Sequence, residues 1–135
     1  MTDFLTVLEV LAIHDDQIAR YGGAPGLRDP GLLEAALFRP QTGYYADLVE
    51  QAAALWESLS QNHPFIDGNK RTAFAVMYTF VVINGARLTA GAGETEDFVL
   101  DLYRSGNFAF APLTSWLRDN LEFSEAPFEQ GDGIL

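Results

Sequence analysis

The 135-residue sequence contains no cysteine, which excludes disulfide bonds, thiolate metal sites and a thiol nucleophile. It also lacks any apolar run of the ~18 residues that a membrane span needs. Its first residues, MTDFLTVLEV, lack the basic start and apolar centre of a signal peptide. Together these absences lead us to expect a small protein of the cytoplasm.

Basic residues are also scarce, because eight Lys and Arg stand against 19 Asp and Glu and give a net charge of −11. Such a chain repels nucleic acid phosphates, so direct binding of DNA or RNA is disfavoured. The same charge, together with only two histidines, argues against a metal-dependent nuclease. An apolar share of 48% and a charged share of 20% are typical of a folded protein, and we expect one domain over residues 1–135 with an acidic tail, 123–135, that frays.

Helix boundary signals dominate what is present and predict an all-α fold. Thr6 and Glu9 form a capping box, and the apolar stripe that follows ends at glycines 22 and 23. Asp29, followed by Pro30, starts a second helix that Pro40 closes. Further helices are predicted over about 47–60, 94–104 and 112–121.

The segment NKRTAFAVMYTFVVI, which begins at Asn69, fits two structures. Its β-branched residues 81–83 favour a strand, with Asn84 and Gly85 as a hairpin turn. A helix of about fifteen residues that ends at Gly85 fits the length better. Because the segment is apolar on every side, we expect it to be the buried central helix. Residues 86–94 are then a loop or a small hairpin.

The densest polar cluster of the chain, NHPFIDGNKR, comes directly before this helix. A helix that begins near Asn69 presents free N–H groups and about half a positive charge at its N-terminus. Lys70 and Arg71 add cationic donors there, and Gly68 allows a ligand to approach the backbone closely. This combination is typical of a phosphate-binding site.

Two further residues of the cluster suggest chemistry. Asp67 is placed to hold a Mg²⁺ that is shared with bound phosphates, and a neutral His63 could take a proton from an attacking hydroxyl. Each residue alone has an ordinary explanation, since Asp-Gly is a common turn and paired cations usually face solvent. The whole set favours transfer of a phosphate-containing group.

The cluster also resembles the signature of the Fic/Doc (Fido) family, HxFx(D/E)GNxR. The matching residues are His63, Phe65, Asp67, Gly68, Asn69 and Arg71. The stretches FLTVLEVLAIHDDQIARYGG, GLRDPGLLEAALFRPQ and NGARLT are similar to the death-on-curing (Doc) branch, the toxins of type II toxin–antitoxin modules. This resemblance implies a compact all-α fold of about six helices.

The resemblance also implies a role for each matching position. His63 corresponds to the general base and Asp67 to the metal carboxylate. Gly68 and Asn69 correspond to the anion cradle, and Arg71 to a phosphate contact. Phe65 corresponds to a core anchor that holds the loop.

Two positions depart from the members of the family that transfer AMP. Lys70 stands where those members have a second glycine, and Phe74 stands where they have a second arginine. Both differences resemble the Doc branch, for which the resemblance implies an ATP- and Mg²⁺-dependent kinase that modifies elongation factor Tu. Protein AMP transfer and a non-catalytic module that binds a nucleotide or a partner are the alternatives.

A cognate, Phd-like antitoxin is the expected partner. The stretch SWLRDN at 115–120 only faintly matches the self-inhibitory pattern of the family, because Asp119 replaces its Glu. Without that element, inhibition has to come from another chain. His14 lies on the apolar stripe of the first helix, and we interpret it as a hydrogen-bonded core histidine rather than a ligand. The loop around Tyr44 falls where the family keeps a flap that positions the target.

Overall fold

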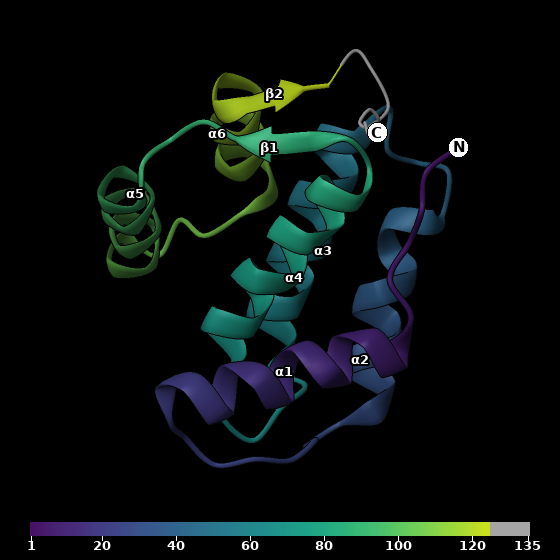
Figure 1. The fold of residues 1–135 in the computed structure, drawn as a ribbon, viewed down its shortest axis with the longest axis vertical. Helices are drawn as coiled ribbons and strands as arrows, with labels where there is room; N and C mark the ends of the chain where they lie inside the picture. The colour runs from purple at the N-terminus through teal and green to yellow at the C-terminus, as the bar shows by residue number, and fades with distance from the viewer. Residues whose placement is uncertain (125–135) are drawn as a thin grey trace, which may run out of the picture.

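The computed structural model describes residues 1–124, which fold into six α-helices, one 3₁₀ helix and two short strands. Their bounds are α1 Val7–Tyr21, α2 Pro30–Phe38, η1 Arg39–Gln41, α3 Leu48–Asn62, α4 Asn69–Ile83, β1 Ala86–Leu88, α5 Ala92–Ser105, α6 Phe110–Asn120 and β2 Leu121–Phe123 (Figure 1). The predicted all-α class is confirmed, and so is the helix predicted for the segment that begins at Asn69.

Local caps explain where the first three helices begin. Thr6 and Glu9 form the expected capping box at α1, and Asp29 accepts a hydrogen bond from the N–H of Leu32 at α2. Asp47 caps α3 in the same way, through the N–H of Glu50. Each such cap stabilises a helix by about 1 kcal/mol.

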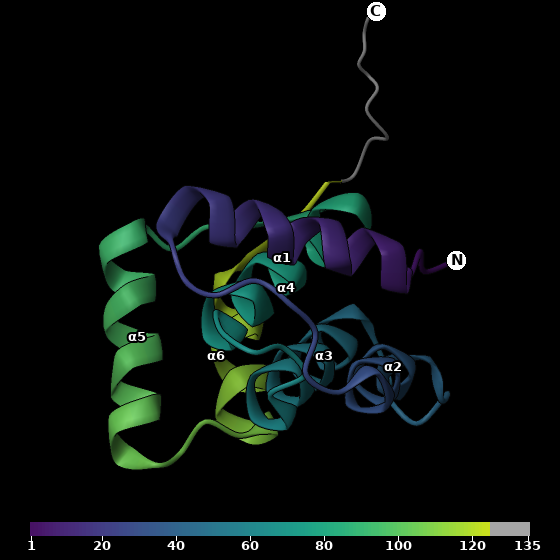
Figure 2. The same cartoon turned by 90° about the horizontal axis from the view of Figure 1, so that it is seen from below.

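The centre of the molecule is the pair α3 and α4, which lie side by side (Figure 1, Figure 2). Trp56 of α3 and Phe80 of α4 are fully buried in the core that this pair forms. The helices α2 and α6 pack against α3, and α1 crosses α4. The loop between α3 and α4 therefore leaves and re-enters the buried centre of the fold.

The central helix α4 is not covered on every side, contrary to expectation. Tyr78, Val82 and Ile83 are each more than 40% exposed. The reason is that the neighbours of α4 cover only part of its circumference and leave an apolar strip in contact with solvent.

The two strands form an antiparallel pair in which Ala86 lies opposite Phe123 and Leu88 opposite Leu121. Residues 86–94 were expected to form a loop or a small hairpin; residues 86–88 instead form a strand, and this strand pairs with a segment that follows α6 rather than within 86–94. Phe123 also belongs to this sheet, so the expected frayed tail does not begin there; residues 125–135 lie outside the described part. None of the helices described in residues 1–124 has the length and apolar character that crossing a membrane requires.

Candidate functional site

The polar cluster forms a tight loop, residues 63–68, between the end of α3 and the start of α4. His63 ends α3 in the left-handed conformation (φ 50°), and among residues 1–124 it is the one non-glycine residue with a positive φ. Gly68 (φ 73°) is left-handed at the other end of the loop and precedes the first residue of α4. Left-handed backbone costs a non-glycine residue about 1 kcal/mol. The loop therefore holds His63 in a strained position with its side chain exposed.

The inner side of the loop is anchored in the core by Phe65, which is 2% exposed. The side chain of Asn69 closes the loop by accepting from the N–H of Phe65 and donating to its carbonyl, both at 2.9 Å. His14 of α1 stacks on the Phe65 ring at 3.8 Å and contacts the carbonyl of Asp67 at 2.8 Å through Nε2. Because a carbonyl can only accept, Nε2 carries the proton. His14 is thus the buried, hydrogen-bonded histidine that we expected, and it supports the loop.

The outer side of the loop is braced by residues 22–29, which connect α1 to α2. The N–H of Ile66 donates to the carbonyl of Gly26, and the N–H groups of Arg28 and Asp29 donate to the carbonyl of Pro64. The guanidinium of Arg28 also donates to the carbonyls of Asn62 and His63, at 3.0 and 2.7 Å. This contact satisfies carbonyls at the end of α3 and holds His63 in its strained conformation.

Sequence reasoning missed this brace, because it treated the glycines after α1 only as a helix terminator. The sequence signal that could have revealed the brace is the number of glycines in residues 22–26. A Cβ on Gly23 would lie 2.8 Å from Oδ2 of Asp67, and a Cβ on Gly26 would lie 2.9 Å from Cδ1 of Ile66. Glycine is therefore required where the two segments meet.

Asp67 is exposed, and each of its carboxylate oxygens accepts one backbone hydrogen bond. The N–H of Ala24 donates to Oδ2 at 3.0 Å, and the N–H of Gly68 donates to Oδ1 at 2.8 Å. These two bonds lower the pKa of Asp67, which is therefore ionised at neutral pH. Each oxygen keeps a lone pair that faces solvent and could bind a cation.

The number of potential metal ligands near Asp67 limits which metal ion could bind there. Within residues 1–124, His, Cys, Asp and Glu side chains do not gather in any group of three that could hold a metal ion. Mg²⁺ commonly binds through one or two carboxylates together with the phosphates of its substrate. One exposed carboxylate next to an anion site fits a Mg²⁺ that arrives with a nucleotide.

The N-terminus of α4 carries no side-chain cap and no acidic residue in its first turn. Its helical hydrogen bonds begin with the N–H of Thr72, which donates to the carbonyl of Gly68. The N–H groups of Asn69, Lys70 and Arg71 therefore have no acceptor within the helix. Two cations at an uncapped, positively polarised helix end are unfavourable unless an anion binds there.

The side chains of these two cations extend to different neighbours of α4. Arg71 donates to the carbonyl of Gly22 at 2.8 Å, and its guanidinium lies 5.7 Å from the centre of the Tyr21 ring. Lys70 lies instead 4.5 Å from the centre of the Tyr103 ring of α5. Asn69 offers its backbone N–H to an anion, while its side chain closes the loop.

A comparison with known protein families matches residues 4–81 to the Fic/DOC family. The chain belongs to this family. It is 46% identical over 95 residues to the "Toxin Doc" of Mycolicibacterium smegmatis, covering 67% of this chain and 71% of that protein. It is 39% identical over 101 residues to the "Protein kinase doc" of Escherichia phage P1, covering 65% of this chain and 80% of that protein.

The charge distribution of this Fic/DOC chain sets the loop apart from the rest of the surface. Four of its eight cations pair with carboxylates, namely Arg20, Arg39, Arg87 and Arg118. Four cations of the described residues form no ion pair, and three of them, Arg28, Lys70 and Arg71, surround the loop, while the fourth is Arg104 of α5. An acidic protein therefore presents unpaired positive charge at this loop.

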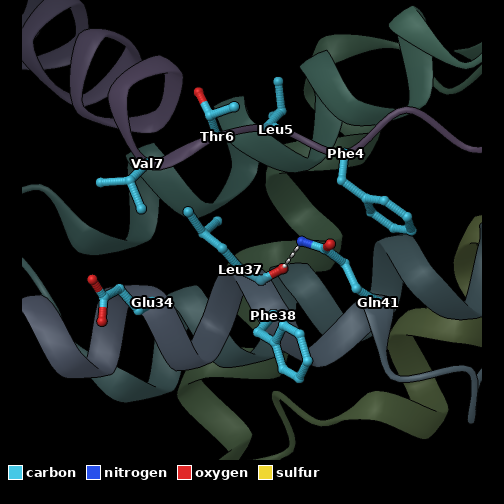
Figure 3. Close-up of a pocket in the computed structure, with 8 residues that line it drawn as sticks. All are labelled: Phe4, Leu5, Thr6, Val7, Glu34, Leu37, Phe38 and Gln41. Carbon is cyan, nitrogen blue, oxygen red and sulfur yellow. Dashed lines mark hydrogen bonds between the residues drawn. The ribbon is translucent and has the colours of Figure 1, made fainter.

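Two cavities adjoin different parts of the Fic/DOC fold. One, of about 350 Å³, is lined by His63, Lys70 and Tyr103, so it opens beside the loop. The other, of about 470 Å³, lies between residues 4–7 and α2 with η1, as Figure 3 shows. The second is larger, but Glu34 is the one charged residue in its lining, and it does not adjoin the loop. We therefore place the candidate active site at the smaller cavity and the N-terminus of α4.

Proposed function

We propose that this Fic/DOC chain is a toxin enzyme that uses ATP and Mg²⁺ to phosphorylate a hydroxyl of a translation factor, elongation factor Tu, in the cytoplasm. The names of its two relatives, a toxin and a protein kinase, support this proposal. The observation that carries it is the combination in one braced loop of an exposed histidine, an ionised carboxylate and an uncapped helix N-terminus. Growth arrest would follow from loss of translation.

Each residue of the site has a distinct role in the proposed reaction. His63 accepts the proton of the target hydroxyl, whose oxygen then attacks the γ-phosphorus while the bond to the β–γ bridging oxygen breaks and ADP leaves. The N–H groups that follow Gly68, together with Lys70 and Arg71, bind the phosphate oxygens. Asp67 would hold Mg²⁺, which neutralises phosphate charge when it is bound.

The positions of Lys70 and Phe74 favour transfer of the γ-phosphoryl group over transfer of AMP. Phe74 packs edge-on against Trp56 at 5.7 Å, so it belongs to the core and supplies no guanidinium for terminal phosphates. Lys70 lines the same cavity as His63 and so adds positive charge beside the base. The phosphorus nearest the base decides the product, because this catalysis consists of positioning and charge stabilisation.

Labelled ATP tests the reaction directly. The purified protein is incubated with elongation factor Tu, or with cell extract, and with ATP labelled at either the α- or the γ-phosphorus. We expect protein-bound label from the γ position only, at a rate that falls by about 10² to 10⁴ in a His63→Asn variant. Label that enters a protein only from the α position would establish AMP transfer instead. A non-catalytic binding module would give no label from either position. Expression of the wild type and of His63→Asn would then arrest growth equally.

We also propose a regulatory partner, a Phd-like antitoxin with a disordered segment that folds on this domain. The exposed apolar strip of α4 (Tyr78, Val82 and Ile83) is a suitable surface, because Tyr78 and Val82 are spaced to meet one face of a partner helix. Ordering the segment offsets part of the free energy of its contacts with the toxin. Proteolysis of the antitoxin readily reverses the inhibition. Co-expression with a neighbouring antitoxin reading frame should give a complex that survives purification and relieves toxicity. Replacement of Val82 by Asp should break that complex while the toxin still arrests growth.

A further inference from the structure

Lys70 is the single lysine of the chain, and its ammonium lies over an aromatic ring. The ring belongs to Tyr103 of α5, and its centre is 4.5 Å from Nζ. Both residues line the cavity that also contains His63. The family match ends at residue 81, so Tyr103 comes from the part of the chain that the match does not cover.

Tyr103 is held in place by contacts with the core. Its ring stacks on the buried ring of Phe108 at 4.3 Å with an angle of 3° between the planes, and Phe108 packs edge-on against Trp56. Its hydroxyl lies 2.6 Å from Oγ of Ser60, a residue of α3 that is 1% exposed. Because Phe108 covers one face of the ring, Lys70 occupies the other.

The electrostatic state of this contact is also defined. Burial raises the pKa of the Tyr103 hydroxyl, so the ring remains a neutral phenol at physiological pH. The face of a neutral aromatic ring attracts a cation. No carboxylate of residues 1–124 pairs with Lys70, so its charge remains available to an anion in the cavity.

We propose that Tyr103 is a positioning residue, which holds the Lys70 ammonium on the His63 side of the anion cradle. A lysine side chain is long and flexible, so without the ring its charge would be spread over many positions. With the ring, the charge remains next to the phosphate group that faces His63, while Arg71 extends to the carbonyl of Gly22 at the end of α1. This inference rests on the proposed function, because it assigns the held charge to a bound ATP.

Nuclear magnetic resonance of protein labelled with ¹³C,¹⁵N-lysine tests the contact without any ligand. One lysine gives one set of side-chain signals, and a ring below the ammonium shifts the ε-methylene protons upfield. We expect this shift in the wild type and in Tyr103→Phe, and its loss in Tyr103→Leu. Phe123→Leu, an exposed aromatic substitution in β2, is the matched control and should keep the shift. An unshifted signal in the wild type, or a shift that survives in Tyr103→Leu, would overturn the proposal.

Calorimetric titration with ATP and Mg²⁺ tests whether the contact between Lys70 and Tyr103 raises the affinity for ATP. We expect Tyr103→Leu to weaken binding about threefold to tenfold and Tyr103→Phe to bind like the wild type, because the ring and not the hydroxyl holds the cation. In a Lys70→Met background, Tyr103→Leu should have no further effect, whereas a merely structural role would weaken binding again. Additive effects would overturn the inference and leave the proposed function intact. Failure of the wild type to bind ATP would refute the proposed function. It would also refute the proposal that the Lys70–Tyr103 contact strengthens ATP binding.

Discussion

Asp67 and His63 belong to the same loop, yet we expect substitutions at the two positions to have different effects. Asp67→Ala should weaken Mg²⁺-supported ATP binding on the order of tenfold or more, because the metal neutralises phosphate charge already before the reaction. His63→Asn should bind ATP nearly as well as the wild type but lose about 10² to 10⁴ in turnover, because a general base acts only in the chemical step. Calorimetry and phosphorylation rates separate the two effects.

The choice of Asn at position 63 serves as the control in this comparison. Asn tolerates left-handed backbone better than Ala does, so the loop keeps its conformation and any change in binding reflects the imidazole itself. Equal loss of ATP affinity in both variants would contradict the separate roles of base and metal ligand.

The hydrogen bonds to Asp67 also predict a pH dependence of stability. The pKa of this carboxyl is lower in the folded protein than its ordinary value of 3.8, because the N–H groups of Ala24 and Gly68 bind the charged form. The stabilisation is therefore present above about pH 4 and is lost as the pH falls through the folded pKa. Urea unfolding of wild type and Asp67→Asn between pH 2.5 and pH 6 should show a stability difference that is largest near pH 6 and shrinks towards acid. A difference that does not change with pH would exclude this origin.

The loop is positioned by another element, the connection between α1 and α2, and two neighbouring glycines allow this dependence to be tested. Gly23→Ala places a Cβ 2.8 Å from the Asp67 carboxylate, whereas Gly22→Ala meets no atom within 4 Å. Both positions have a positive φ, so both substitutions strain the backbone, by about 1 kcal/mol or more. We expect both variants to lose stability in urea unfolding, but only Gly23→Ala to weaken binding of ATP and Mg²⁺. Equal binding by the two variants would show that the brace does not position Asp67.

Over residues 1–124, three paired cations, Arg39, Arg87 and Arg118, join different elements, whereas Arg28, Lys70 and Arg71 form no ion pair and surround the loop. Arg39 joins η1 to α3 through Glu57 at 2.7 Å and Ser58 at 2.8 Å, and the carboxylate of Glu57 also accepts from the N–H of Phe110 in α6. Removal of Arg39 leaves Glu57 half-buried without its counter-charge, which costs on the order of 2 kcal/mol. Arg71, by contrast, donates to the carbonyl of Gly22 and lies over the ring of Tyr21 at the end of α1.

These two arginines should therefore respond in opposite ways to the same substitution. Arg39→Met is expected to lower the free energy of unfolding and leave ATP affinity unchanged in the folded protein. Arg71→Met is expected to weaken ATP binding with little change in unfolding. Urea denaturation and calorimetry on both variants check this, and Arg87→Met, which breaks a well-exposed ion pair, should change neither quantity by much. Loss of ATP affinity in Arg39→Met would show that the two groups of cations are not separate.

The sequence by itself determined the helices and the chemical content of the site. Thr6, Asp29 and Asp47 cap helices through N–H groups two or three residues away, so their effect is visible in a short window of sequence. The same holds for residues 63–71, whose types and spacing indicate an anion site whatever the packing around them. Local hydrogen bonds and side-chain chemistry are encoded locally.

Only the tertiary structure decided how that loop is held and what surrounds it. The support of Asp67 by His14, the brace from residues 22–29 and the ring of Tyr103 below Lys70 join residues that are 33 to 53 positions apart. The pairing of β1 with β2 is of the same kind. Such contacts depend on how the helices pack around α3 and α4, and packing is a property of many side chains together. No short window of the sequence contains it.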